Sequence, residues 1–251
     1  MAKMRLAFFK FASCSGCQLS ALRVNERLLD LLDLVEIDYW VMVSDLRREG
    51  PYDVAFVEGS ITTPEEIEEI KEVRRRSEVL VALGDCAVTG GLNSIREWMS
   101  QKEAEKAVYE NPLAIKSTSV RPVDYYVDVD VYLSGCPPST SDIVEVIKDL
   151  ALGFPPRLPK YPVCVECKLS ENECLLLKGV PCMGPVVKAG CGAICPNLGR
   201  PCEGCYGPTV DPNTESLIEK LREAGLSDRE IMYKFRKYAG LTKEFRREAG
   251  L

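Results

Sequence analysis

Cysteine, more than any other residue, constrains what this chain can fold into. It occurs twelve times in 251 residues, whereas histidine is absent. Cysteines at this density form either a disulfide framework or metal sites. The lack of histidine excludes Cys₂His₂ zinc sites, Ser–His–Asp triads and histidine-ligated metals. Any bound metal must therefore be held largely by thiolate.

Composition and the first residues favour metal sites over disulfides. Disulfide frameworks belong mainly to small secreted domains without a sufficient core, and this chain, 46% apolar, can build one. The start, 1–5, leads into a short apolar segment with no signal-peptide pattern, and no stretch is long enough to span a membrane. We therefore expect a cytoplasmic protein with reduced thiols. Its net charge of −6 (32 − 38) argues against nucleic acid as a partner.

The first half of the chain alternates short apolar segments with helical periodicity. This rhythm predicts an α/β fold with a parallel sheet and helices on both faces. A helix that starts at Thr63 with Pro64 in its first turn ends in the basic run 74–76. Strands are expected at 5–11, 35–43, 53–57, 78–83 and 131–134, and further helices at 18–33, 103–109 and 139–152.

The composition changes near residues 153–156. From there to about residue 213 the chain is rich in Cys, Gly and Pro. Such a segment buries little apolar surface by itself and needs further stabilisation, for example by bound metal. The remainder is charged and helical in period, which predicts two or three short helices. We expect three parts, residues 1–155, 156–213 and 214–251.

Four cysteines follow predicted strands. Cys14 and Cys17 come after the first strand, Glu58 after the third, Cys86 after the fourth and Cys136 after the fifth. Because the carboxyl ends of parallel strands share one edge, where open α/β sheets bind ligands, these side chains should converge. The alternative is that the four thiols fill the core as small apolar groups.

The remaining eight cysteines lie in the Gly- and Pro-rich stretch. Iron–sulfur clusters are commonly held by four thiolates, and two zinc ribbons would use the same ligands. Backbone N–H groups in such loops can bind cluster sulfurs, which favours clusters. The eight are Cys164, Cys167, Cys174, Cys182, Cys191, Cys195, Cys202 and Cys205.

Several of these segments resemble the motifs of nickel–iron hydrogenase small subunits. The resemblance extends over about residues 5–208 and is strongest to cytosolic members, namely archaeal sulfhydrogenase delta subunits and the small subunits of F420-non-reducing hydrogenases. It rests on Cys14-Ser15-Gly16-Cys17, Glu58-Gly59-Ser60, Gly84-Asp85-Cys86-Ala87 with Gly90-Gly91, Gly135-Cys136-Pro137-Pro138, Tyr161-Pro162-Val163-Cys164, Cys182-Met183-Gly184-Pro185 and Pro201-Cys202-Glu203-Gly204-Cys205.

The resemblance implies a flavodoxin-like domain, a ferredoxin-like cluster domain, a helical tail and three [4Fe–4S] clusters. The proximal cluster would be held by Cys14, Cys17, Cys86 and Cys136, the medial by Cys191, Cys195, Cys202 and Cys205, and the distal by Cys164, Cys167, Cys174 and Cys182. Membrane-bound relatives use a histidine at the distal cluster, so Cys164 or Cys167 must replace it here, and Cys195 restores a medial ligand that those relatives lack. Asp85 stands where many members have threonine.

By this resemblance the chain relays electrons and leaves the splitting of H₂ to a nickel–iron large subunit. It lacks that subunit's Asp-Pro-Cys-x-x-Cys signature and carries no GxGxxG nucleotide motif. A further iron–sulfur or flavin-containing subunit would exchange electrons with it, while the final acceptor stays open. Glu58 would either assist proton exit or simply accept backbone N–H bonds. Two other functions are an iron–sulfur subunit of a respiratory or hydrogenase-related complex without H₂ activity, and a zinc-stapled interaction protein.

Overall fold

The computed structural model describes residues 2–23, 27–112 and 116–250. The chain divides into two compact units, Met1–Arg157 and Leu158–Leu251, which are described separately. No helix within the described ranges combines the length and the apolar character that a membrane span requires. All twelve cysteines fall in these ranges and are free thiols.

The first unit is built on a parallel sheet of five strands in the order β2-β1-β3-β4-β5. The strands are β1 (Met4–Lys10), β2 (Val35–Trp40), β3 (Tyr52–Glu58), β4 (Ser77–Leu83) and β5 (Val131–Leu133). This order is one of the two common orders of doubly wound sheets. The predicted α/β fold and its parallel sheet are confirmed. β2 is shorter than predicted because the carbonyl of Trp40 accepts the N–H groups of Val43 and Ser44 in a turn.

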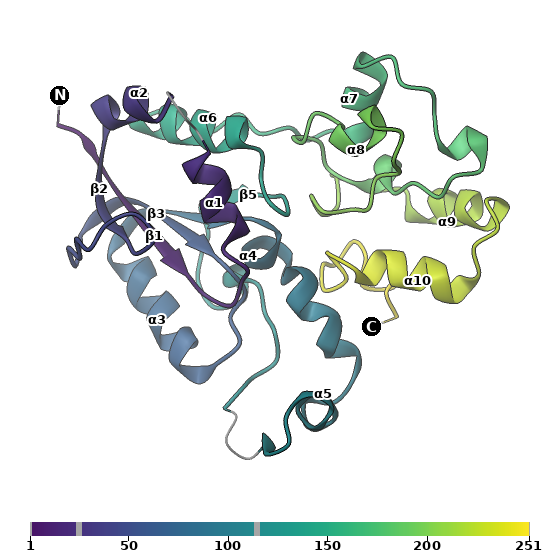
Figure 1. Ribbon diagram of the computed structural model, residues 1–251, viewed down its shortest axis with the longest axis horizontal. Helices are drawn as coiled ribbons and strands as arrows, with labels where there is room; N and C mark the ends of the chain where they lie inside the picture. The colour runs from purple at the N-terminus through teal and green to yellow at the C-terminus, as the bar shows by residue number, and fades with distance from the viewer. Residues whose placement is uncertain (1, 24–26, 113–115, 251) are drawn as a thin grey trace. The chain divides into compact units, whose positions relative to one another are not determined.

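Helices cover both faces of the sheet (Figure 1). α3 (Pro64–Arg75) lies on one face, and its Ile70 and Val73 pack on the strands. α1 (Gly16–Leu22), α2 (Arg27–Leu34) and α6 (Thr140–Ala151) lie on the other. The predicted start of α3 is confirmed, because Thr63 caps it in a reciprocal capping box with Glu66.

The first unit differs from the prediction in two places. The single helix expected at 18–33 is wrong, because the N–H of Arg23 turns to the carbonyl of Ser20 and ends α1 there. The chain resumes as α2, and residues 24–26 lie outside the described ranges. The excursion between β4 and β5 contains α4 (Asp85–Thr89), the 3₁₀ helix η1 (Gly91–Trp98), α5 (Gln101–Val108) and η3 (Val123–Tyr125), of which only α5 was expected.

The second unit contains short helices joined by long loops. Its cysteine-rich part has α7 (Val163–Leu169), η4 (Leu176–Lys178), η5 (Gly184–Val186) and α8 (Ile194–Asn197). α9 (Thr214–Glu223) and α10 (Asp228–Arg236) follow, as the helical period of the last residues predicts. The described residues of this unit, 158–250, carry no named strand, so loops and short helices position these cysteines.

Candidate metal centres

The carboxyl edge of the sheet holds the four early cysteines. β1 leads into the loop with Cys14 and then into α1 with Cys17, while Cys86 lies in α4 directly after β4. The loops after β4 and β5 are tied together, because the N–H of Asp85 donates to the carbonyl of Gly135 at 2.8 Å. Cys136 is therefore held beside the Cys86 loop, and the sheet brings to one edge cysteines as far apart in the sequence as Cys14 and Cys136.

These thiols influence one another electrostatically. Burial, the charge of Asp85 and then the thiols of Cys136 and Cys14 raise the pKa of Cys86 to about 12. Burial and then Asp85 and Cys14 raise the pKa of Cys136 to about 11. Burial, followed by Glu58, raises the pKa of Cys17. The raised pKa values of Cys17, Cys86 and Cys136 favour the protonated thiols at neutral pH, whereas a metal ion deprotonates a coordinating thiol outright.

A glycine leaves room for the Cys17 thiol. Gly84 follows β4 directly and has a φ of 86°, and a Cβ built on it would lie 2.2 Å from Cys17 Sγ. No other residue fits there, because the contact is far inside van der Waals distance and the φ is positive. The glycine therefore belongs to the cysteine site. The motif Gly84-Asp85-Cys86 was noted in the sequence, but this contact joins positions 67 apart and needs the fold.

Glu58 is almost fully buried at the end of β3, at 1% exposure. Its carboxylate accepts the N–H of Cys17 at 3.2 Å and of Gln18 at 3.3 Å. It thus ties the first turn of α1 to the sheet, which is the simpler of the two roles expected for it. Its part in proton exit stays a prediction.

The second unit brings one set of four thiols together around α7. Cys164 and Cys167 lie three positions apart on α7, a spacing that puts both on one face of a helix. Burial and then the thiols of Cys182, Cys167 and Cys174 raise the pKa of Cys164 to about 11. A Cβ on Gly184 would lie 3.2 Å from Cys164 Sγ and 3.5 Å from Cys182 Sγ, so a glycine again opens space for thiols.

Two of the other four thiols of this unit, those of Cys191 and Cys202, receive backbone N–H groups. The pKa of Cys191 is raised by burial and lowered in part by the N–H groups of Ile194 and Ala193. Burial also raises the pKa of Cys202, which the N–H of Gly204 opposes and the thiols of Cys182, Cys205 and Cys191 reinforce. N–H groups aimed at sulfur stabilise bound thiolate and tune iron–sulfur potentials.

The two late sets meet at one hydrogen bond. The N–H of Cys202 donates to Cys182 Sγ at 3.2 Å, and the N–H of Met183 donates to the carbonyl of Cys202 at 3.0 Å. Met183 is fully buried between them. The proposed ligands of two different sets are therefore in direct contact.

Two glutamates beside late cysteines were not foreseen as site residues. Glu166 accepts the N–H of Gly190 at 2.8 Å and of Ala193 at 3.1 Å. Glu203 pairs with Lys237 at 3.0 Å and Lys234 at 3.5 Å, which fixes α10 to the cysteine loop. Their only sequence signal is position, since each lies between the two cysteines of a Cys-x-x-Cys pair.

The described thiols do not surround a single point. Among the described residues, no three Cys, Asp or Glu side chains are arranged so that they could hold one metal ion. Several of the thiols instead influence one another electrostatically, and glycines or backbone N–H groups lie beside some of them.

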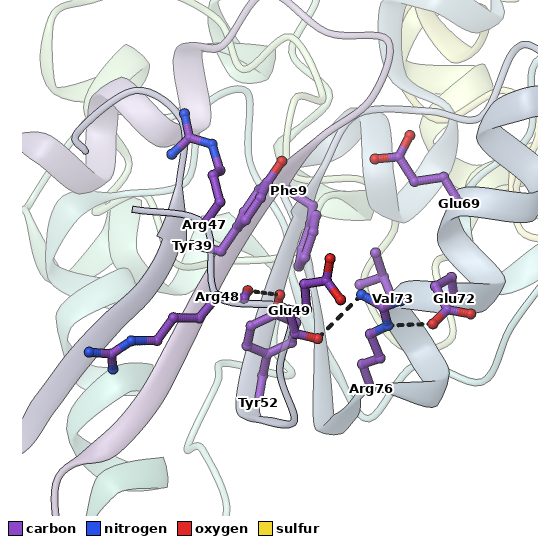
Figure 2. Close-up of a pocket in the computed structure, with 10 residues that line it drawn as sticks. All are labelled: Phe9, Tyr39, Arg47, Arg48, Glu49, Tyr52, Glu69, Glu72, Val73 and Arg76. Atoms are coloured by element: carbon purple, nitrogen blue, oxygen red, sulfur yellow. Dashed lines mark hydrogen bonds and ion pairs between the residues drawn. The ribbon is translucent and has the colours of Figure 1, made fainter. Parts of the chain in front are cut away.

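A pocket of about 320 Å³ lies in the first unit, away from these thiols (Figure 2). The connection from β2 to β3, residues 41–51, is described throughout and forms turns without a helix. The rings of Phe9, Tyr39 and Tyr52 therefore line this pocket. α3 borders the pocket, and there the carboxylate of Glu72 accepts a hydrogen bond from Arg76. No cysteine lines this pocket.

Comparisons with known proteins agree with this arrangement. Residues 14–150 match the family described as NADH ubiquinone oxidoreductase, 20 Kd subunit. The chain is 41% identical to sulfhydrogenase 2 subunit delta of Pyrococcus furiosus, over 94% of this chain and 99% of that protein. It is 34% identical to an F420-non-reducing hydrogenase vhu subunit of Methanococcus voltae, over 92% of this chain and 94% of that protein.

A solved NAD⁺-reducing [NiFe]-hydrogenase in its H₂-reduced state contains a chain of similar fold. The TM-score is 0.59 at 31% identity, and the match covers 63% of this chain and 96% of that one. Sequence and fold thus agree with the resemblance that the cysteine motifs indicated. The chain belongs to the small subunits of nickel–iron hydrogenases, oxidoreductases that act on H₂.

Proposed function

We propose that this chain is the electron-transfer subunit of a cytosolic nickel–iron hydrogenase and that it holds three [4Fe–4S] clusters. The observation that carries the proposal is the placement of the twelve free thiols, four in the loops and helices after the strands of one parallel sheet and eight among the loops and short helices of the second unit. Four thiolates per cluster is the usual ligation.

The proposed ligands follow the three groups. The flavodoxin-like part, residues 1–155, would hold the proximal cluster, and the ferredoxin-like part, 156–213, would hold the other two, with 214–251 as a helical tail. The ligands are Cys14, Cys17, Cys86 and Cys136 for the proximal cluster, Cys191, Cys195, Cys202 and Cys205 for the medial, and Cys164, Cys167, Cys174 and Cys182 for the distal.

When bound, the clusters supply one-electron redox chemistry, and this chain supplies ligation, spacing and charge. Gly84 keeps space free beside Cys17, and Glu58 fixes the helix that carries Cys17. The N–H of Cys202 bonds Cys182 Sγ and so joins the two late sets. Burial excludes water from several ligands, with Cys17, Cys182 and Cys202 each at most 8% exposed.

The partners follow from this role. A nickel–iron large subunit would split or form H₂, and a further iron–sulfur or flavin-containing subunit would take or supply the electrons. Sulfhydrogenase and F420-non-reducing hydrogenase relatives support a cytoplasmic complex of this kind. The final acceptor, whether NADP, polysulfide, ferredoxin or a heterodisulfide, is left open by this proposal. Glu58 is the candidate for proton exit toward the large subunit.

Anaerobic purification of the complex with metal analysis tests the proposal. We expect about twelve irons from this chain, four for each Cys₄ cluster, together with a nickel-bearing partner. A colourless protein that contains zinc would contradict the proposal, and about four irons would restrict it to the proximal site. Cys205→Ser should abolish electron delivery to external acceptors while H/D exchange at the partner survives. If both activities survived unchanged, the medial assignment would be wrong.

A further inference from the structure

Glu166 connects two cysteine sets that the sequence keeps apart. It lies on α7 between Cys164 and Cys167, so its backbone belongs to the Cys164 set. Its carboxylate, however, accepts the N–H of Gly190 at 2.8 Å through Oε1 and the N–H of Ala193 at 3.1 Å through Oε2. These two residues flank Cys191, which belongs to the other set. Both oxygens of one side chain therefore hold the loop that carries a ligand of the neighbouring set.

The loop that Glu166 holds has an unusual backbone. Gly190 and Gly192 have φ values of 129° and 64°, and Ala193, which is not a glycine, has a φ of 51°. A left-handed conformation is unfavourable for an L-residue because its Cβ approaches the following carbonyl oxygen, so a specific contact is needed to hold Ala193 in it. The carboxylate of Glu166 bonds the N–H of this residue. The same N–H group and that of Ile194 also approach the Cys191 thiol.

The charge of Glu166 has different partners from the charge of Glu203, the acid between Cys202 and Cys205. Glu203 pairs with Lys234 and Lys237, which offset its charge. Glu166 bonds backbone N–H groups, which carry no net charge, so a full negative charge remains beside the loop. The charge of Glu166 accordingly contributes to the raised pKa of Cys191, after the larger effect of burial.

A negative charge at this place has a definite redox consequence. Reduction adds an electron to the site, and a fixed negative charge nearby disfavours the reduced state. The part-buried position of the carboxylate limits screening by salt. Removing the charge should therefore raise the reduction potential.

We propose that Glu166 is a positioning residue for the Cys191, Cys195, Cys202 and Cys205 site, which it serves by holding the loop of Cys191 and by keeping the potential of that site low. This proposal rests on the proposed function, because it requires that the four thiols ligate a cluster. Since its oxygens reach across from α7, Glu166 also fixes the spacing between the medial and distal sites.

The test compares three variants of the whole complex, purified anaerobically, by EPR-monitored redox titration and iron analysis. Glu166→Gln removes the charge and leaves one oxygen that can accept a hydrogen bond. Its amide N–H₂ group must then face the backbone N–H of either Gly190 or Ala193. Glu166→Asp keeps the charge but withdraws it by one methylene. Glu171→Gln is the matched control, because Glu171 is exposed and stands between Cys167 and Cys174, and its substitution changes the net charge equally.

We expect Glu166→Gln to raise the medial potential relative to both wild type and Glu171→Gln, with a smaller change at the distal site. Glu166→Asp should keep the potential closer to wild type and lose iron from the medial site. Wild-type potentials and iron content in both Glu166 variants would overturn the proposal. If Glu166→Gln did not accumulate folded, the iron content of Glu166→Asp would decide alone. A wild-type complex without three clusters would instead contradict the proposed function.

Discussion

The two cysteine regions of this chain are built by opposite means. In the first unit, five parallel strands bring Cys14, Cys17, Cys86 and Cys136 to one edge, and the sheet has its own core on both faces. In the second unit, loops and short helices carry eight cysteines with no named strand. The first region is therefore a site placed on a folded scaffold, whereas we expect the second to be a fold that depends on its site. The difference follows from how much apolar surface each can bury without metal.

Removal of iron should have the largest effect, and it should affect the two regions differently. We expect chelation under anaerobic conditions to leave residues 1–157 folded and to open the cysteine-rich loops of 158–213, because binding free energy there is folding free energy. Limited proteolysis with mass spectrometry would show rapid cleavage in the second unit and a protected first unit. Equal protection of both units after complete iron loss would show that the loops fold without metal.

A pair of glycine substitutions sharpens the comparison at the level of single residues. Gly84→Ala would place a Cβ 2.2 Å from Cys17 Sγ at a positive φ, so we expect loss of about four irons from the proximal site and a large fall in thermal stability. Gly192→Ala, in the second unit, also has a positive φ, but its Cβ would meet nothing within 4 Å. Its cost should be about 1 kcal/mol of backbone strain, with the iron content unchanged.

Iron analysis and thermal unfolding of the two variants measure this contrast directly. Equal effects of the two substitutions would mean that backbone strain alone, and not the space beside Cys17, makes Gly84 necessary. The comparison requires only that each variant is purified in the same complex.

Much of the first region could be predicted from the sequence, because its signals are periodic. Apolar runs indicated the strands, and Thr63-Pro64 marked a helix start that the structure confirms. Cysteines placed after strands then pointed to one sheet edge. The break after Leu22 was missed, because the apolar positions continue on both sides of it and the period of 3.6 gives no sign of a chain turn.

The second region was predictable in composition but not in conformation. Spacing indicated sets of cysteines, yet nothing in the sequence showed that Glu166 would reach Gly190 or that Cys202 would donate to Cys182. Such contacts depend on loop paths with positive φ, which lack a hydrophobic period. Likewise the contact of Gly84 with Cys17 depends on two strands being neighbours across the sheet.

The charges around the two regions also differ, which leads to a smaller expected effect. Asp85 is buried and raises the pKa of both Cys86 and Cys136, whereas the charge of Glu203 is offset by two lysines. We expect Asp85→Asn to raise the potential of the proximal site, and Glu203→Gln to change the medial potential less. Redox titration followed by EPR checks this order, and a larger shift in Glu203→Gln would reverse the electrostatic comparison.

The smallest effects are expected at helix caps, one in each unit. Thr63 and Ser227 both form capping boxes, with Glu66 and Glu230 respectively. Substitution of either residue by alanine should cost about 1 kcal/mol. Hydrogen exchange read by mass spectrometry should rise in α3 alone for Thr63→Ala and in α10 alone for Ser227→Ala. A rise in both units from either substitution would show that they unfold as one.

The cap of α10 should also depend on pH. Hydrogen bonds from the side chain and backbone of Ser227 lower the pKa of Glu230. A lowered folded-state pKa means that the stabilisation is present above the ordinary glutamate pKa, about 4.3, and is lost as the pH falls through the folded-state value. Acidification should therefore increase exchange in α10 of the wild-type protein, and Ser227→Ala should show less of this acid-induced increase. If the variant and the wild type responded equally to acid, the capping box would not be the source of the dependence.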